Sequence, residues 1–284
     1  MKASYYPGCS LESSAREYNS SFKAVARTLA IDLEELSGWT CCGAASAHVT
    51  DDGLALSLAA RNLIIADNVG GDLVVPCTSC YHRLKSAERE LKLGKVAEGN
   101  LGQYSNKVKI KHSTDFIWEV CGEKAIREKT TKPLAGLNPV CYYGCLSVRP
   151  PKITDAKDPE DPRVMDNIMT ALGADVKNWS YKTDCCGGDL ILTHPELARK
   201  LVKRLFDMAV EAGANCIVVG CPMCHTNLDT TQKQILDDNG RRYNIPIYYF
   251  TELMGLAFGD ESINKWLNGH LTNGKTLLRQ KGLL

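Results

Sequence analysis

Apolar residues recur with two different periods along this chain, and stretches of the two kinds alternate. Continuous apolar runs at 70–77 and 214–221 are typical of strands buried on both faces of a parallel sheet. Residues 13–30 instead show helical spacing, with one apolar face formed by Tyr18, Phe22, Val25 and Leu29. Alternating strands and helices of this kind indicate an α/β fold with a parallel sheet.

The same order of elements occurs twice. Each half is predicted to contain a first strand, an amphipathic helix, a buried strand, a polar helix and a closing strand with its helix. These lie at 2–6, 13–30, 70–77, 81–93 and 108–116 in the first half, and at 138–143, 193–213, 214–221, 225–236 and 245–253 in the second. We therefore predict a tandem duplication: two similar parallel-sheet α/β domains with a pseudo-twofold relation, covering residues 1–135 and 136–284.

Local signals refine the two amphipathic helices. Ser14 with Glu17, and Thr193 with Glu196, fit the spacing of a capping box at a helix start. In the second helix the apolar face is expected to include Leu197, Leu201 and Leu205.

Cysteines repeat with the same register. The chain has 284 residues and 13 cysteines, and ten of these form two matching sets: Cys9, Cys41, Cys42, Cys77 and Cys80, then Cys145, Cys185, Cys186, Cys221 and Cys224. The adjacent pairs and the C-x-x-C pairs are each 144 positions apart, whereas the first cysteines are 136 apart. The second copy thus has eight extra residues, which we expect in a surface loop at 147–163, rich in proline and charge.

Topology predicts where these thiols lie. Cys9, Cys77, Cys145 and Cys221 each follow a predicted strand, and ligands of open parallel sheets bind at the carboxyl ends of strands. Cys80 and Cys224 fall in the first turn of a helix, whose positive end favours thiolate. Five thiols in each half are therefore expected to converge.

The number of thiols narrows the kind of metal. Zinc and cubane iron–sulfur clusters each take four protein ligands, and the ferredoxin run C-x₂-C-x₂-C-x₃-C-P is absent from this sequence. Five thiolates, two of them adjacent, better fit a cluster with separated irons. Adjacent cysteines would then bind different irons, or one sulfur would bridge two. Gly43 and Gly187, which follow the pairs, are expected to let the backbone approach the cluster at positive φ.

These motifs, Cys41-Cys42-Gly43 and Cys185-Cys186-Gly187 with their partners, resemble the cysteine-rich CCG domain family, and most closely the catalytic B subunits of heterodisulfide reductases. The resemblance implies one noncubane [4Fe–4S] cluster per domain, each held by the five cysteines of its set. It also implies a disulfide substrate between the clusters, CoM-S-S-CoB in methanogens, cleaved to two thiols by one electron from each cluster.

Partners follow from the same resemblance. No G-x-G-x-x-G fingerprint opens a helix, so neither flavin nor nicotinamide is expected in this chain. Electrons would come from a ferredoxin-like C-type subunit and a flavin-containing A-type subunit of a flavin-based electron-transfer complex, of the kind that bifurcates electrons in methanogenesis.

His82 and His225 lie one or two residues beyond the C-x-x-C motifs and are candidate proton donors to the product thiolates. The alternative for both is a hydrogen-bonding role at a helix start. The cysteines outside the repeat are expected to be buried and inert; they are Cys121, Cys141 and Cys216.

Other classes of protein stay open or are disfavoured. An electron-transfer subunit of glycolate, lactate or succinate oxidation, without its own disulfide substrate, is the main alternative. A zinc-bound scaffold and a thioredoxin-like exchanger are further ones. A net charge of +1 gives no sign of a nucleic-acid partner. Without a signal peptide or a run of about 20 apolar residues, we expect a cytoplasmic protein that does not span the membrane.

Overall fold

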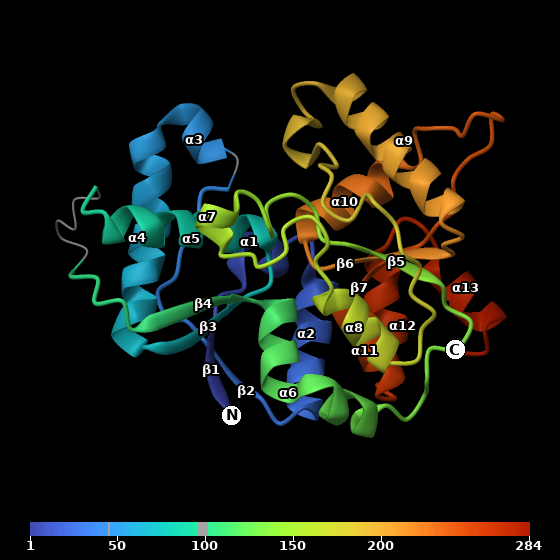
Figure 1. Cartoon of the computed structure of the whole chain (residues 1–284), viewed down its shortest axis with the longest axis horizontal. Helices are drawn as coiled ribbons and strands as arrows, with labels where there is room; N and C mark the ends of the chain where they lie inside the picture. Colours follow the sequence, from blue (N-terminus) through green and yellow to red (C-terminus); the bar gives the residue numbers. More distant parts are fainter. Residues whose placement is uncertain (45, 96–101) are drawn as a thin grey trace.

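The computed structural model describes residues 1–44, 46–95 and 102–284 and contains two parallel sheets (Figure 1). The first sheet has the order β2-β1-β3-β4 and the second the order β5-β6-β7. Their strands are β1 (Lys2–Tyr5), β2 (Asp32–Glu35), β3 (Gly71–Val75), β4 (Val108–His112), β5 (Pro139–Tyr142), β6 (Cys216–Val219) and β7 (Ile247–Tyr249). Every neighbouring pair is parallel, which confirms the predicted duplicated α/β class.

Helices connect and cover the strands. The first half contains α1 (Gly8–Glu12), α2 (Arg16–Thr28), α3 (Ser46–Thr50), α4 (Asp52–Val69), α5 (Thr78–Lys92) and α6 (Ser113–Lys129). The second contains α7 (Pro151–Thr154), α8 (Val164–Ala171), η2 (Gly188–Leu190), α9 (Pro195–Glu211), α10 (Pro222–Thr231), α11 (Phe250–Ala257), α12 (Ile263–Trp266), η3 (Leu267–Gly269) and α13 (Gly274–Gln280).

The two halves differ at one sheet edge. β2 is an edge strand, and three of its four residues are the exposed acids Asp32, Glu34 and Glu35. Such a strand carries no apolar pattern, which explains why the sequence reading missed it. In the second half, the amides of Asp175 and Lys177 bond to the carbonyls of Leu137 and Pro139 at 2.9 and 2.8 Å, without forming a strand.

Both predicted capping boxes are wrong. α2 begins at Arg16 after Ala15, because α1 and its turn occupy the residues before it, and α9 begins at Pro195 after His194. Neither N-cap residue makes a side-chain cap, and a proline in the first helical turn sets the start of α9 by its fixed φ. The buried face of α9 is also shifted: Leu205 is buried, but Leu197 is 46% exposed.

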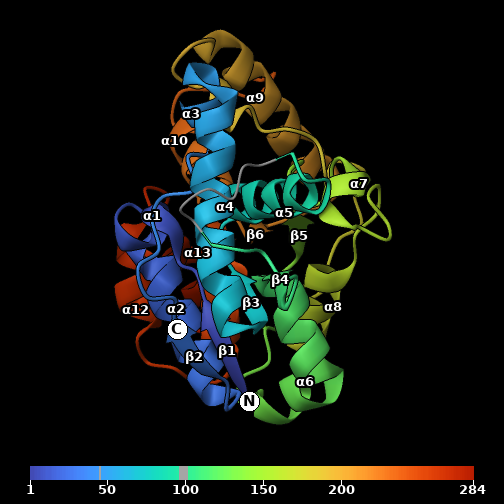
Figure 2. The same cartoon turned by 90° about the vertical axis from the view of Figure 1, so that its left-hand side faces the viewer.

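One continuous core joins the halves. α2 packs against α11 and α12, and α6 packs against α8, so each half covers helices of the other (Figures 1 and 2). The hydroxyls of Ser21 and Thr251 form a buried hydrogen bond of 2.7 Å across this contact. The predicted boundary between residues 135 and 136 stays a prediction.

The extra segment of the second copy is more ordered than a surface loop. Val148 and Thr154 within it are buried, and α7 packs on α5 of the first half. The Tyr81 hydroxyl donates to the Thr154 carbonyl at 2.8 Å. The segment therefore closes one side of the contact between the halves.

Candidate metal centre

The carboxyl ends of the strands bring the first set of cysteines together. The sulfurs of Cys9 and Cys41 lie 3.6 Å apart, and those of Cys42 and Cys80 lie 3.2 Å apart. Cys77 hydrogen-bonds to Cys80. Cys9 and Cys41 are exposed, whereas the other three are buried, so the set extends from the core to the surface.

The second set repeats these contacts one for one. Cys145 hydrogen-bonds to Cys185, the sulfurs of Cys186 and Cys224 lie 3.9 Å apart, and Cys221 hydrogen-bonds to Cys224. Cys185 is again exposed, and Cys186 and Cys221 are buried. The pairing of thiols thus follows the sequence duplication.

The two sets meet at their C-x-x-C segments. The Cys77 thiol hydrogen-bonds to Cys221, and the neighbouring Thr78 side chain bonds to Cys221 as well. The junction of the two halves is therefore also the junction of the two thiol sets.

Hydrogen bonds among the thiols divide them into donors and acceptors. The bonds that Cys41 and Cys80 donate lower the pKa of Cys42 to about 3, and the bond from Cys145 lowers the pKa of Cys185 to about 6. The donors Cys41 and Cys145 have raised pKa values for the same reason. Thiolate is the form of cysteine that binds metal, so each set has a preformed ligand.

Glycine makes room for a sulfur at equivalent positions of both halves. A Cβ atom on Gly8 would lie 2.9 Å from Cys80 Sγ, and one on Gly144 would lie 3.1 Å from Cys224 Sγ. Both glycines have positive φ, +72° and +71°. The sequence reading instead assigned this role to the glycines of the C-C-G motifs.

Those later glycines serve packing in the described structure. A Cβ on Gly43 would meet the side chain of Ala47 at 2.7 Å, and one on Gly187 would meet Leu201 and Ala198 of α9 at 3.1 and 3.2 Å. Their amides do approach sulfur, since Gly43 N lies 3.5 Å from Cys41 Sγ and Gly187 N lies 3.2 Å from Cys185 Sγ. They therefore let the C-C-G loop rest on the helix that follows.

Two buried tyrosines hold the adjacent cysteines and were missed by sequence reasoning. The Tyr6 hydroxyl donates to the Thr40 carbonyl at 2.7 Å, and the Tyr142 hydroxyl donates to the Asp184 carbonyl at 2.7 Å. Each of these carbonyls precedes a cysteine pair. The signal was present in the repeat, because both tyrosines lie three residues before the first cysteine of their half.

The two predicted histidines have different surroundings. His225 is buried, its Nε2 lies 3.2 Å from the Ile247 carbonyl, and burial lowers its pKa well below the usual value. His82 is half-buried, and its Nε2 has no hydrogen-bond partner among the residues described. Burial and the nearby Arg83 lower the pKa of His82 to about 4. Proton donation by either stays a prediction.

The three remaining cysteines lie outside both sets. Cys141 and Cys216 are fully buried in β5 and β6, and Cys121 is half-buried on α6. Burial raises the pKa of all three.

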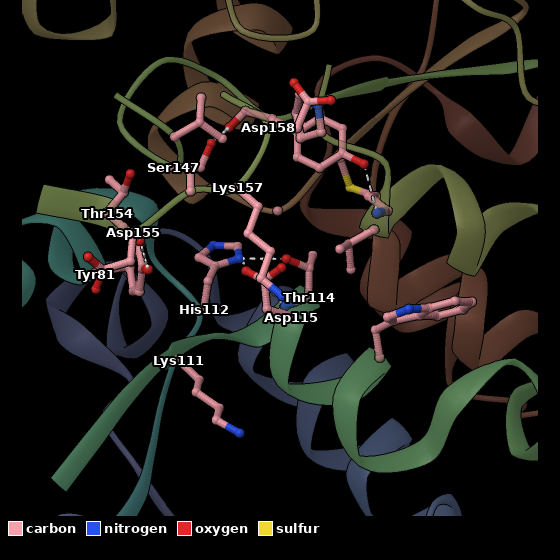
Figure 3. Close-up of a pocket in the computed structure, with 18 of the residues that line it drawn as sticks. Tyr81, Lys111, His112, Thr114, Asp115, Ser147, Thr154, Asp155, Lys157 and Asp158 are labelled. Atoms are coloured by element: carbon pink, nitrogen blue, oxygen red, sulfur yellow. Dashed lines mark hydrogen bonds between the residues drawn. The ribbon is translucent and has the colours of Figure 1, made fainter. Parts of the chain in front are cut away.

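A cavity of about 450 Å³ lies between the halves, at the ends of β4, β5 and β6 (Figure 3). His112 points into it from the end of β4, and Lys157 of the inserted segment reaches across toward Asp115. Its walls also include the aromatic rings of Tyr81, Trp118 and Tyr143.

A short polar link joins the cavity to the thiol junction. His112 Nε2 lies 3.2 Å from Thr78 Oγ1, and Thr78 follows Cys77 directly. The His112 ring also lies against Gly220, which precedes Cys221. Burial lowers the pKa of His112 to about 4, so the ring is neutral at pH 7. Sequence reasoning did not single out His112, because its role depends on packing between the halves.

The donor set suits an iron–sulfur group by its chemistry. Each half supplies five sulfur ligands, and thiolates select iron–sulfur clusters, zinc or copper(I) over hard ions. Across the described part of the chain, no three His, Cys, Asp or Glu side chains surround one point as ligands of a single metal ion. The sulfurs lie in pairs instead, each pair at a different place along the set.

Comparison with known proteins places the chain in a family. The model of the cysteine-rich CCG domain matches residues 3–85 and 140–229, which is more than half of the chain. The chain belongs to the cysteine-rich CCG domain family, as its duplicated motifs indicated.

Relatives of known name extend over most of the chain. The 8-methylmenaquinol:fumarate reductase membrane anchor subunit of Wolinella succinogenes is 30% identical over 281 residues, covering 96% of this chain and 98% of the relative. The B subunit of the ferredoxin:CoB-CoM heterodisulfide reductase of Methanosarcina mazei is 28% identical, covering 91% and 89%. A protein of Archaeoglobus profundus that is like the heterodisulfide reductase B subunit is 26% identical, covering 91% of each.

A solved structure shares the fold. The crystal structure of a hypothetical protein from Helicobacter pylori superposes with a TM-score of 0.74 at 11% identity over 96% of this chain. The chain spans about half (52%) of the length of that protein. The chain is thus an iron–sulfur oxidoreductase-family protein by its relatives, and no helix in its described residues is long and apolar enough to cross a membrane.

Proposed function

We propose that this chain is the catalytic subunit of a heterodisulfide reductase-type complex that reduces a disulfide at two noncubane [4Fe–4S] clusters, one in each cysteine set. The observation that carries the proposal is the contact between Cys77 and Cys221. Reducing a disulfide to two thiols takes two electrons, and this contact brings two separate ligand sets to one place.

The ligands would be the ten cysteines of the repeat: Cys9, Cys41, Cys42, Cys77 and Cys80 for one cluster, and Cys145, Cys185, Cys186, Cys221 and Cys224 for the other. When bound, each cluster supplies one electron and an open iron for a departing thiolate. The described residues supply the rest of the site.

The cavity between the halves is the proposed substrate chamber. Its aromatic walls exclude water from a small molecule. Lys157 has no ion-pair partner in the described part of the chain, so its ammonium is available to an anionic group of a disulfide substrate. His112 and Thr78 hold the polar path between this chamber and the thiol junction.

Partners are proposed from the relatives and from the resemblance. The Methanosarcina relative takes electrons from ferredoxin, as its name states. We infer a ferredoxin-like C-type subunit and a flavin-containing A-type subunit as electron donors, in a cytoplasmic complex, with no flavin or nicotinamide in this chain.

A second function is favoured by the Wolinella relative, which matches almost the whole chain. In this alternative the two clusters pass electrons between other subunits and no disulfide is reduced. The two candidates share the cysteine ligands and differ in the substrate.

The first experiment is anaerobic purification with the partner subunits, followed by iron and acid-labile sulfide analysis. We expect about eight of each per chain, four for each five-cysteine set. About four irons, or zinc without sulfide, would contradict the two-cluster arrangement.

A matched pair of variants tests the chemistry. Cys186→Ala removes a buried ligand and should halve the iron content and abolish disulfide reduction. Cys216→Ala removes an equally buried thiol outside the sets and should preserve both. Full disulfide turnover by Cys186→Ala would refute the two-cluster mechanism. Electron transfer without disulfide turnover in the unaltered complex would establish the second function instead.

A further inference from the structure

Tyr18 on α2 touches both cysteine loops at once. Its side chain is fully buried, and its hydroxyl lies 3.1 Å from the Gly220 carbonyl and 3.4 Å from the Pro76 carbonyl. Gly220 directly precedes Cys221, and Pro76 directly precedes Cys77. One hydroxyl therefore contacts the equivalent peptide of each half, at the place where the two sets meet.

The position of this hydroxyl is fixed from several sides. The Tyr18 ring stacks on Tyr249 of the second half, with ring centres 4.2 Å apart and planes at 4°. Tyr249 in turn stacks on His225 at 4.3 Å, and Ser113 Oγ lies 3.1 Å from the Tyr18 hydroxyl. The ring therefore cannot follow one loop without leaving the other.

The two carbonyls depend on few partners. A buried carbonyl that loses its hydrogen bond loses free energy comparable to desolvation of the group. Besides Tyr18, the His112 ring bonds to both of these backbone groups. A phenol has a single proton, so the Tyr18 hydroxyl is shared between Gly220 and Pro76 and couples the two loops.

We propose that Tyr18 is a positioning residue that sets the separation of the two C-x-x-C segments, and with it the separation of the two metal sites. The proposal rests on the proposed function in that both sets hold clusters. If one substrate bond must reach both sites, their separation has to be constant, and Tyr18 supplies that constraint from within the core.

The test compares Tyr18→Phe with Tyr5→Phe. Both tyrosines are fully buried and stacked, Tyr5 on Phe22 at 5.5 Å, but the Tyr5 hydroxyl bonds to Asn19 Oδ1 at 3.0 Å and touches no cysteine loop. The probe is hydrogen exchange at the amides of Tyr81 and His225, which bond to the carbonyls of Cys77 and Cys221 at 2.9 and 3.0 Å.

We expect Tyr18→Phe to accelerate exchange at both amides about tenfold, which corresponds to the loss of one buried hydrogen bond. Tyr5→Phe should leave both rates unchanged. In the iron-loaded protein, the magnetic interaction between the two reduced sites, measured by electron paramagnetic resonance, should change in Tyr18→Phe and persist in Tyr5→Phe.

Acceleration at one amide only, or at neither, would overturn the proposal, because a shared tie must affect both loops. If Tyr18→Phe does not fold, Ser113→Ala removes the hydroxyl that bonds to Tyr18 and should accelerate exchange at the same two amides, a lack of effect overturning the proposal equally. Failure of the proposed function is recognised separately, by a low iron content or absent disulfide turnover in the unaltered protein. The exchange result does not depend on either of these.

Discussion

At the scale of single residues, the site depends on small side chains as much as on thiols. Gly8 and Gly144 leave the space that Cys80 and Cys224 occupy. The repeated tyrosines Tyr6 and Tyr142 hold the peptides before the adjacent cysteines. These four residues belong to the Tyr-x-Gly-Cys stretch that opens each half, so the first strand of each copy both supplies a cysteine and shapes the space for a distant one.

Gly8→Ala should reduce the metal content. The added Cβ would lie 2.9 Å from Cys80 Sγ, so the sulfur must move away from its set. We expect the iron content to fall to about half, since only the first set is affected.

The control for backbone strain is Gly38→Ala. Gly38 also has a positive φ, +73°, but an added Cβ there would have no neighbour within 4 Å. It should lose a similar stability, about 1 kcal/mol, and keep its iron. Equal iron loss in both variants would show that strain, not crowding of the sulfur, is responsible.

At the scale of elements, the inserted segment and α8 are tied to the sheet by a buried ion pair. Lys182, which is 1% exposed, lies 2.7 Å from Asp166 of α8 and 2.9 Å from Asp161. The Tyr143 hydroxyl donates to the same Asp166 carboxylate at 2.6 Å. This network orients the chain segment that follows Cys145 and borders the cavity.

Asp166→Asn should lower the free energy of unfolding by about 2 kcal/mol, because the buried Lys182 ammonium loses its buried carboxylate partner and keeps only the half-exposed Asp161. Chemical denaturation measures the change. Asp175→Asn is the matched control: its ion pair with Lys177 is largely exposed and should contribute at most about 1 kcal/mol. Equal losses in the two variants would contradict the importance of the buried pair.

At the scale of the whole molecule, the last part of the chain is fastened to the second sheet by a titratable pair. His270 Nε2 lies 3.0 Å from Glu252 of α11, and both side chains are almost completely buried. Burial alone would lower the pKa of His270, but the charge and hydrogen bond of Glu252 outweigh it and raise that pKa above its usual value of 6.5.

The stability of the whole fold should therefore depend on pH through this pair. A histidine whose pKa is raised by folding adds stability that is fully present below pH 6.5 and lost as pH rises through the folded pKa. The difference in unfolding free energy between the unaltered chain and His270→Gln should decrease as pH rises above 6.5. A difference that is constant with pH would show that the pair does not titrate as described.

The accuracy of the sequence reading follows the range of the interactions involved. Buried strands such as 70–77 were visible because their apolar runs are local, whereas β2 was missed because an acidic edge strand has no such run. The capping boxes failed because α1 and Pro195, not side-chain caps, decide where α2 and α9 begin. The cysteine sets could be grouped because strand ends meet at one edge of a parallel sheet.

The sequence by itself determined the duplication, the parallel α/β class and the ten cysteines that gather at the strand ends. These follow from periodicity and spacing, which act between neighbours along the chain. Only the tertiary structure decided that Cys77 meets Cys221, that Tyr18 contacts both loops and that His112 borders a cavity between the halves. Those contacts arise where α2 packs on α11 and the two sheets share one core, and no local pattern encodes which surfaces of two similar halves face each other.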